Sequence, residues 1–310
     1  MNGWVISIGT GSSQLPLIRE AKRIGFNILG IDRSPKSNAI DEYIQLSTYD
    51  KDAVIDEIER NHKEKKFKAV LARVSGPAIC TAAYTSFKLG LPGYSINLAR
   101  MSVTKSLLRN YAEKIGVPTM EGNSLLKKPK WIEGSDWIIK PDQPVVGKKN
   151  VYRVTNKAEL ERAFSAASNE SLNKFVECQA YSPGRDIGIV LAMSFGKLLW
   201  HSFYEEIVES KPGNVIGMGH RIPVRGLAEN YFKSMVRSSL NFLDKQLATG
   251  FFFFSFRCEK NMEPKLYEMN PGLCGDDLAD KIFPSFWPGF NFFSIDVSLM
   301  LGERPKFPEA

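Results

Sequence analysis

The sequence predicts a doubly wound α/β domain followed by α+β units built on antiparallel sheets. Two observations predict this fold class. In residues 1–95, apolar runs alternate with helical patterns, which is typical of a parallel sheet. Beyond Ser102, several apolar runs come in pairs around short polar turns, the pattern of antiparallel strands. The chain has 310 residues and 43% hydrophobic content, which suits more than one core.

Three strand-to-helix units predict the first domain. Trp4–Ile8 is a short apolar strand, a turn of small residues over 9–13 follows it, and helical spacing continues over 15–25. A second strand over 27–31 ends at Asp32. The remaining units are a strand over 42–46 before a helix over 51–62, and a strand over 69–72 before a helix over 78–89. Parallel strands place such turns at their carboxyl edge, so we expect the 9–13 turn there.

The turn over 9–14, together with Asp32, has part of a dinucleotide-binding pattern. A glycine-rich turn before a helix offers backbone N–H groups to phosphate, and an acid that ends the second strand can hold a ribose. The third glycine position is not filled in the expected register. An NAD site is therefore one interpretation, and a tight turn made of small residues is the other.

Lys140 ends a predicted strand over 137–140 and leads into a polar, glycine-containing loop over 141–150, before a strand over 151–154. A lysine that leaves a strand beside a basic loop places positive charge over a polyphosphate. A solvated hairpin would show the same residues. The other predicted elements are helices over 104–115, 157–167, 231–247 and 290–301, and strands over 174–178, 187–193, 197–203, 251–257 and 265–269.

Glu268 and Asn270 stand two residues apart at the end of the last strand. Side chains at this spacing point to the same face of a strand, so both can offer oxygen atoms to one hard cation such as Mg²⁺. An acid and an asparagine near a strand end also occur in solvated turns.

Taken in order, these parts resemble the ATP-grasp family over nearly the whole chain. The residues that carry the resemblance are Thr104-Lys105, Gly116-Val117-Pro118, Lys140-Pro141, the loop around Gly147, residues 179–186, and Glu268-Met269-Asn270-Pro271. The resemblance implies a pre-ATP-grasp domain over 1–95 and an ATP-grasp fold of two α+β subdomains, over 96–178 and 179–310. It also implies an ADP-forming ligase that phosphorylates a carboxylate to an acylphosphate, which an amine or another nucleophile then attacks.

By this resemblance, Lys105 and Lys140 bind the ATP phosphates, beneath a loop that contains Gly147 and Lys148. Both Glu177 and Gln179 suit the first position of the adenine hinge. Gln179 stands seven residues before Asp186, which is the spacing that the family shows to the acid that holds the ribose, so we favour Gln179. Adenine would then pair with backbone groups near Ala180 and Ser182, and Glu177 would be an edge contact or a solvated strand-end acid.

The resemblance also assigns Glu268 and Asn270 as ligands of Mg²⁺, with Mn²⁺ as an alternative. Two positions depart from the family pattern. Ser255 stands where relatives carry an acidic companion ligand, and its hydroxyl is a weaker ligand than a carboxylate. Gly272 stands where an arginine is usual, and Arg257 or Arg221 would compensate for it.

Residues 219–223 and Gly275 followed by Asp276 resemble the branch of the family that joins carboxylates to amines. This branch suggests a catalytic role for His220 beside Lys140 and Arg257. Substrate contacts are expected at Arg221, Gly272, Gly275 and Asp276. A lone histidine is also common as a structural residue.

Composition limits the partners. The formal net charge of +7 favours anionic ligands, but the basic runs over 63–68 and 127–130 are isolated, so we expect no nucleic acid. The four cysteines lack paired spacing, and the N-terminus shows no export signal, so we expect a cytoplasmic protein. No apolar run suits a membrane span. We expect small carboxylate and amine substrates and, from the resemblance, a homodimer. The alternatives are an ATP-grasp carboxylase, a nucleotide-binding protein with a degenerate site, and an NAD-dependent dehydrogenase.

Overall fold

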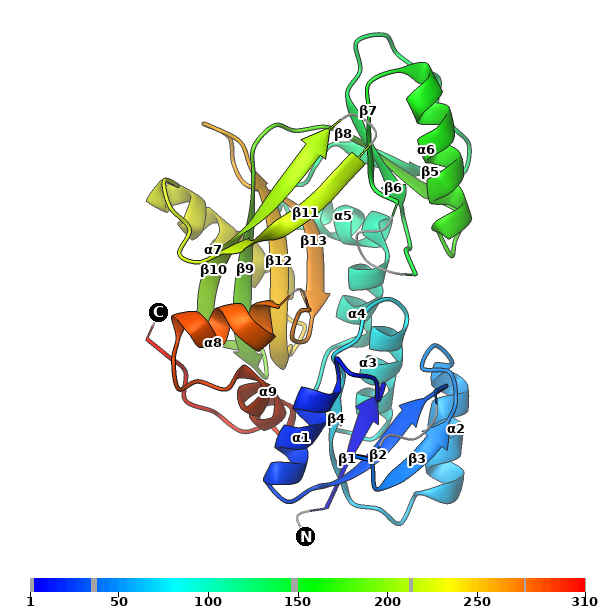
Figure 1. Cartoon of the computed structure of the whole chain (residues 1–310), viewed down its shortest axis with the longest axis vertical. Helices are drawn as coiled ribbons and strands as arrows, with labels where there is room; N and C mark the ends of the chain where they lie inside the picture. Colours follow the sequence, from blue (N-terminus) through cyan, green and yellow to red (C-terminus); the bar gives the residue numbers. More distant parts are fainter. Residues whose placement is uncertain (1–2, 35–37, 146–149, 212–213, 276, 310) are drawn as a thin grey trace.

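The structure, a computed structural model, describes residues 3–34, 38–145, 150–211, 214–275 and 277–309. Three β-sheets make up the molecule, and each gathers strands from one part of the chain. In Figure 1 the N-terminal sheet lies at the bottom, the central sheet at the top, and the C-terminal sheet between them on the left. In the described part of the chain, none of the helices has both the length and the apolar character needed to cross a bilayer.

The N-terminal sheet is parallel, in the order β3-β2-β1-β4. Its strands are β1 (Trp4–Ile8), β2 (Asn27–Asp32), β3 (Glu42–Gln45) and β4 (Phe67–Leu71), and its helices are α1 (Leu15–Arg23), α2 (Lys51–Asn61) and α3 (Ala78–Lys88). Continuous apolar runs form these strands because a parallel sheet is covered on both faces. Helix α2 packs against α3, and α1 packs against α9 (Phe292–Met300) from the other end of the chain.

Two helices, α4 (Ile96–Val103) and α5 (Lys105–Lys114), lead into the central sheet. That sheet has the order β5-β8-β6-β7 and contains β5 (Gly122–Leu125), β6 (Trp137–Pro141), β7 (Tyr152–Val154) and β8 (Val176–Ala180). Helix α6 (Lys157–Glu170) packs against it. Its small core includes Ile139, Leu160 and Val176, all nearly inaccessible.

The C-terminal sheet has the order β11-β10-β9-β12-β13 and is antiparallel throughout. Its strands are β9 (Arg185–Ser194), β10 (Lys197–Lys211), β11 (Asn214–Arg221), β12 (Gly250–Cys258) and β13 (Lys265–Pro271). Helix α7 (Glu229–Leu243), the π-helical turn η1 (Leu278–Ile282) and α8 (Phe283–Phe286) complete this half. One continuous core joins this sheet to the N-terminal domain through α4 and α5.

The predicted fold class is confirmed, but several predicted limits differ from the structure. The predicted subdomain boundary after residue 178 falls inside β8, so the chain changes sheets only between Ala180 and Arg185. Strand β10 extends well beyond the predicted end at Phe203 and pairs with β11, which was not predicted. Polar, charged and glycine residues interrupt that hairpin, so it lacks the long apolar runs used for strand prediction.

Candidate active site

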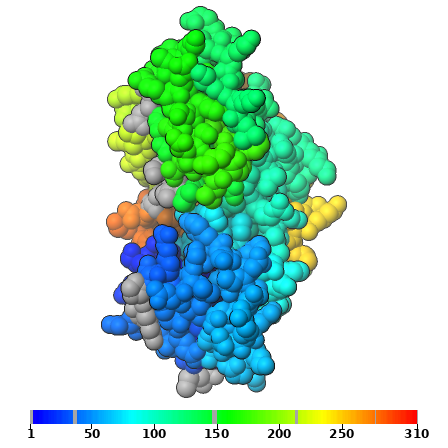
Figure 2. Space-filling view, turned by 90° about the vertical axis from the view of Figure 1, so that its right-hand side faces the viewer, coloured from blue at the N-terminus to red at the C-terminus, as the bar shows by residue number. Residues whose placement is uncertain are grey.

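A cavity of about 580 Å³ lies where the three sheets meet. The N-terminal domain contributes Ser13, Arg73 and Ser75 from the carboxyl edge of its parallel sheet, where ligands commonly bind in such sheets. The other two walls come from the central sheet with α5 and from one face of the C-terminal sheet. Figure 2 shows the central subdomain lying directly above the N-terminal domain, so the cavity is shared between parts of the chain that are distant in sequence.

Lys140 is the buried cation of the central wall. It lies near the end of β6 directly opposite Glu177 on β8, and only 8% of the residue is exposed. Burial lowers the pKa of Lys140 to about 8, with a further decrease from Lys105, while Glu177 and Glu268 act in the opposite direction. Its ammonium also lies 5.8 Å from the ring centre of Tyr267 on β13, so the two sheets approach each other at this lysine.

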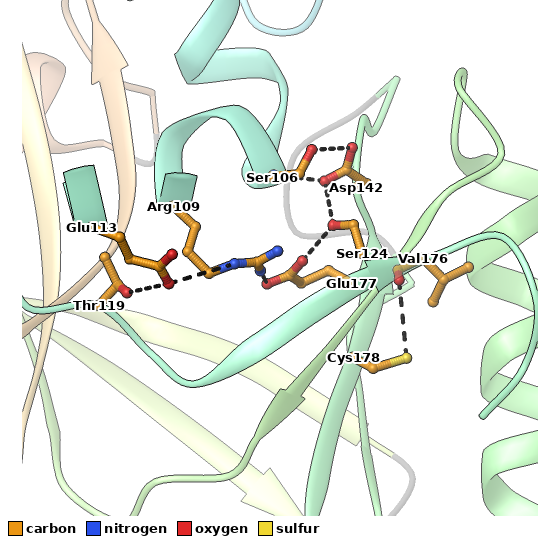
Figure 3. Close-up of polar contacts among 9 residues, drawn as sticks. All are labelled: Ser106, Arg109, Glu113, Thr119, Ser124, Asp142, Val176, Glu177 and Cys178. Carbon is orange, nitrogen blue, oxygen red and sulfur yellow. Dashed lines mark hydrogen bonds and ion pairs between the residues drawn. The ribbon is translucent and has the colours of Figure 1, made fainter. Parts of the chain in front are cut away.

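Glu177 is held by a polar network rather than by the main cavity (Figure 3). Its carboxylate pairs with the Arg109 guanidinium from α5 and accepts a 2.6 Å hydrogen bond from the Ser124 hydroxyl on β5. Among the described residues, Glu177 lines a smaller void beside Lys105 and Lys140. This placement keeps its negative charge close to both lysines.

Asp142 connects the exit of β6 to the start of α5 (Figure 3). Its carboxylate is fully buried and accepts hydrogen bonds from the Ser106 N–H at 2.7 Å, the Ser106 hydroxyl at 3.0 Å and the Asn173 amide at 2.7 Å. Its backbone carbonyl accepts the Lys105 N–H at 3.0 Å. Because a helix begins with unsatisfied N–H groups, Asp142 acts as a cap supplied from another element. The cap fixes Lys105 relative to the strand that carries Lys140.

Gln179, Ala180 and Ser182 line the main cavity where β8 leaves the central sheet. Gln179 and Glu177 share one face of the strand, as alternate residues must. Glu177 is turned toward Arg109, so the two candidates for the first hinge position have different environments. This arrangement favours Gln179 as the residue beside the cavity, in agreement with the spacing argument.

Asp186 and Arg257 form an ion pair on the C-terminal wall, 3.1 Å apart, and both line the cavity. Burial raises the pKa of Asp186 to about 6, while the charge of Arg257 opposes the increase. Arg257 also donates to the Gly184 carbonyl at 3.2 Å. The guanidinium is therefore partly committed to positioning the segment that follows β8.

Glu268, Asn270 and Ser255 all line the cavity from neighbouring strands β13 and β12. Ser255 lies directly opposite Glu268 in the register. A carboxylate and an amide oxygen suit a hard divalent cation, so Glu268 and Asn270 fit one. Within the ranges that the structure describes, no group of three or more His, Cys, Asp or Glu side chains is suited to hold a metal ion.

The catalytic candidate His220 and the predicted substrate residues separate into two groups. His220, Gly272 and Gly275 line the cavity, whereas Arg221 is not among the described residues that do so. Arg221 instead pairs with Glu205, whose other oxygen accepts the Arg185 side chain at 2.8 Å. The predicted contacts Gly147, Lys148 and Asp276 lie outside the described residues.

Gly272 has a backbone reason to be glycine. Its φ of +88° is strained for other residues, and a Cβ there would lie 3.0 Å from both the Ala72 carbonyl oxygen and the Tyr94 hydroxyl. An arginine at this position would meet the end of the first-domain sheet. The departure from the family pattern therefore follows from how closely the N-terminal domain packs on β13.

Comparison with solved structures gives matches over nearly the whole chain, while no protein-family model and no curated protein matches it. An L-amino acid ligase from Bacillus licheniformis shares 18% identity with a TM-score of 0.74, covering 97% of this chain and 74% of that one. The ADP complex of N5-carboxyaminoimidazole synthetase from Staphylococcus aureus shares 12% identity with a TM-score of 0.75, covering 99% and 79%. The biotin carboxylase domain of the Hydrogenobacter thermophilus 2-oxoglutarate carboxylase shares 15% with a TM-score of 0.74, covering 98% and 71%.

The chain has an ATP-grasp fold. The identities are too low to transfer an activity, so the matches establish the architecture and nothing more. Within this ATP-grasp fold, the 9–14 turn belongs to the domain that precedes the two ATP-grasp subdomains. Its Thr10 N–H donates to the Asp32 carboxylate at 2.9 Å, which also accepts the Ser34 N–H at 3.0 Å. Asp32 thus stabilises its own turn, and this favours the structural interpretation over the NAD site.

Arg73 and Tyr204 are among the cavity residues that the sequence did not predict. Arg73 is buried and donates to the Ser13 carbonyl at 3.1 Å, the Cys274 carbonyl at 3.0 Å and the Asp280 carboxylate. It therefore ties the first domain to the segment after β13. Its position just beyond a predicted strand, at the carboxyl edge, is the signal that would have found it. Tyr204 had no such signal, because it lies where the strand was expected to have ended.

Proposed function

We propose that this chain is an ATP-dependent carboxylate–amine ligase that forms an acylphosphate and releases ADP and phosphate. The observation that carries the proposal is the pairing of two lysines with two oxygen donors across one cavity. Lys105 and Lys140 come from the side of the central sheet, and Glu268 and Asn270 come from β13. Cations and a divalent metal ion together neutralise a transferring phosphoryl group.

The cavity supports a division of roles among its residues. Lys105 and Lys140 would neutralise the phosphates, and Glu268 and Asn270 would hold Mg²⁺, or Mn²⁺ in its place. ATP supplies a phosphoryl group that turns a carboxylate oxygen into a leaving group. Gln179, Ala180 and Ser182 would lie beside adenine, because they line the cavity where β8 ends.

The remaining part of the cavity would take the carboxylate and the amine. It is lined by the carboxyl edge of the N-terminal sheet, by residues 272–275 and by His220. Apolar side chains such as Phe253 and Leu278 stand among the polar ones. The L-amino acid ligase among the structural neighbours supports small substrates that carry both polar and apolar groups.

The test is ADP release from ATP, measured against paired panels of carboxylic acids and amines, with either substrate omitted as the control. We expect release that requires one acid and one amine together, with phosphate formed in equal amount. Lys140→Met should remove it. Binding of ATP without substrate-dependent ADP release across broad panels would instead indicate a nucleotide-binding protein with a degenerate site.

A carboxylase is the second candidate, because one structural neighbour is a biotin carboxylase domain in complex with MgADP and bicarbonate. Bicarbonate should leave the release of ADP unchanged if the chain is a carboxylate–amine ligase. Stimulation by bicarbonate in the absence of any other carboxylate would favour the carboxylase.

A further inference from the structure

A row of four residues crosses the cavity face of the C-terminal sheet. The strand registers place Glu268 opposite Ser255, Ser255 opposite Gly188, and Gly188 opposite Tyr204. Directly opposed residues of antiparallel strands share a face, and Glu268, Ser255 and Tyr204 all line the cavity. The row therefore runs along the wall where a divalent cation would bind.

Tyr204 lies across the gap that Gly188 leaves in this row. A Cβ on Gly188 would lie only 2.0 Å from Cζ of the Tyr204 ring, so the phenol covers the glycine backbone. Tyr204 is 6% exposed; burial raises the pKa of its phenol, and the neighbouring Ser255 side chain acts in the opposite direction. The phenol thus reaches from β10 over β9 to β12, as far as the position next to Glu268.

This arrangement fills the space that a longer acidic side chain at position 255 would need. A glutamate there would compete with the Tyr204 phenol for the space beside position 255. The chain instead combines three compatible residues: a glycine that admits the ring, a tyrosine that crosses the glycine, and a serine short enough to meet the hydroxyl. Any other residue at 188 would displace the ring, so the three depend on one another.

We propose that this site takes one divalent cation with its nucleotide, held by Glu268 and Asn270, and that the Tyr204–Ser255 pair occupies the place of a second acidic ligand. The phenol presents a neutral hydrogen-bonding group to the bound phosphates or the substrate carboxylate there. This inference rests on the proposed function, because it takes ATP as the nucleotide. Mg²⁺ in nucleotide sites is commonly held by one or two carboxylates plus phosphate oxygens, so one acid with Asn270 is a sufficient protein contribution.

The test counts Mn²⁺ ions per bound non-hydrolysable ATP analogue by electron paramagnetic resonance, with analogue binding measured separately by calorimetry. We expect one ion for the natural chain. We expect two for the Ser255→Glu, Tyr204→Phe double variant, because removing the phenol oxygen gives the new carboxylate its place. A count of two in the natural chain overturns the inference, and so does a double variant that stays at one.

A separate variant tests the hydroxyl of Tyr204. Tyr204→Phe keeps the ring over Gly188, so it should retain the ion count of one while turnover falls about tenfold, as expected for one lost hydrogen bond. Tyr231→Phe is the matched control, because its hydroxyl donates to the Glu259 carbonyl at 2.7 Å and Tyr231 is not among the described cavity residues. Unchanged turnover in Tyr204→Phe would show that the hydroxyl does not act on the bound phosphates or the substrate.

The failure of this inference and the failure of the proposed function can be told apart. Failure of the ATP analogue to bind at all would defeat both, whereas binding with two ions would defeat only this inference.

Discussion

The central wall and the C-terminal wall of the cavity present different charged groups to it. On the central wall, the acids are buried behind the surface, where Glu177 pairs with Arg109 and Asp142 caps α5. Lys140 lines the cavity in front of them. On the C-terminal wall, Asp186 is paired with Arg257 at the surface itself, while Glu268 faces the cavity. One wall therefore offers positive charge, and the other offers oxygen donors.

The side chains of the two walls are held in position in different ways. The lysines are long and flexible, so their placement depends on a network that anchors the elements beneath them. Glu268 and Asn270 lie on adjacent same-face positions of one strand, so the pleat alone aligns them. Substitutions behind the central wall should therefore act at a distance, and substitutions on β13 should act directly.

The largest effect is expected from Lys140→Met, which removes the buried cation but keeps much of the side-chain volume. We expect turnover to fall about 10³-fold, the scale seen when a preorganised group that stabilises transition-state charge is lost. Substrate-dependent ADP release measures this loss. Lys157→Met is the control, because Lys157 is exposed at the start of α6. Equal turnover in both variants would contradict the role of Lys140.

Glu268→Gln tests the opposite wall. The amide keeps the shape of the side chain but removes its charge, so Mg²⁺ should bind more weakly and turnover at fixed Mg²⁺ should fall about 10²-fold. Raising the Mg²⁺ concentration should recover part of the loss. Glu263→Gln is the matched control, since Glu263 is exposed just before β13 and pairs only loosely with Arg237 at 3.5 Å. A Mg²⁺ dependence identical to that of the natural chain would remove Glu268 from the metal site.

Asp142→Ala tests whether the central wall depends on its hidden network. The change leaves the Ser106 and Asn173 donors without their buried acceptor, so the free energy of unfolding should fall by about 3 kcal/mol. Urea unfolding measures it. Asp52→Ala, at an exposed position in the first turn of α2, should cost far less. A stability loss no larger than that of the control would mean that the cap contributes little.

The fold was largely predictable because its strands and helices follow simple apolar periods. The parallel sheet was predicted from Trp4–Ile8 and the three apolar strands that follow it, and all four strands lie in one sheet. The hairpin of β10 and β11 was not predictable in the same way. Its strands run through polar and charged residues such as Glu205, whose partners Arg185 and Arg221 lie on neighbouring strands rather than close by along the chain.

The site was predictable only where a residue's role follows from local sequence. Glu268 and Asn270 share a strand, and Lys140 ends one, so their placement in the cavity follows from strand geometry. Arg109 and Tyr204 act through contacts between elements that are far apart in sequence. No spacing along the chain encodes such contacts, so only the assembled sheets reveal them.

The pH dependence of ATP binding sharpens the description of the central wall. The pKa of Lys140 is lowered to about 8, so its positive charge is lost as pH rises through that value. Affinity for the ATP analogue should therefore fall above pH 8, by up to about tenfold for each further pH unit. Calorimetry between pH 7 and 10 measures it. The charge of Glu177 raises the pKa of Lys140, so Glu177→Gln should start the fall at lower pH. If the pH profile of affinity were unchanged in Glu177→Gln, Glu177 would have no effect on the pKa of Lys140.

The smallest effect is expected from Arg221→Ala, on the C-terminal sheet outside the cavity. Arg221 is half exposed, pairs with Glu205 and is not among the described cavity residues, so turnover should change less than about twofold, as for other surface ion pairs. Glu205 keeps Arg185 as a partner at 2.8 Å, so the strand pair should remain intact. Arg257→Ala is the informative contrast, because it exposes the Asp186 carboxylate inside the cavity without its cation. Steady-state assays of both variants give the comparison. If Arg221→Ala reduced turnover more than Arg257→Ala did, the substrate would have to reach beyond the cavity to Arg221 on the hairpin of β10 and β11. Arg221 would then belong to the substrate site, as the sequence predicted.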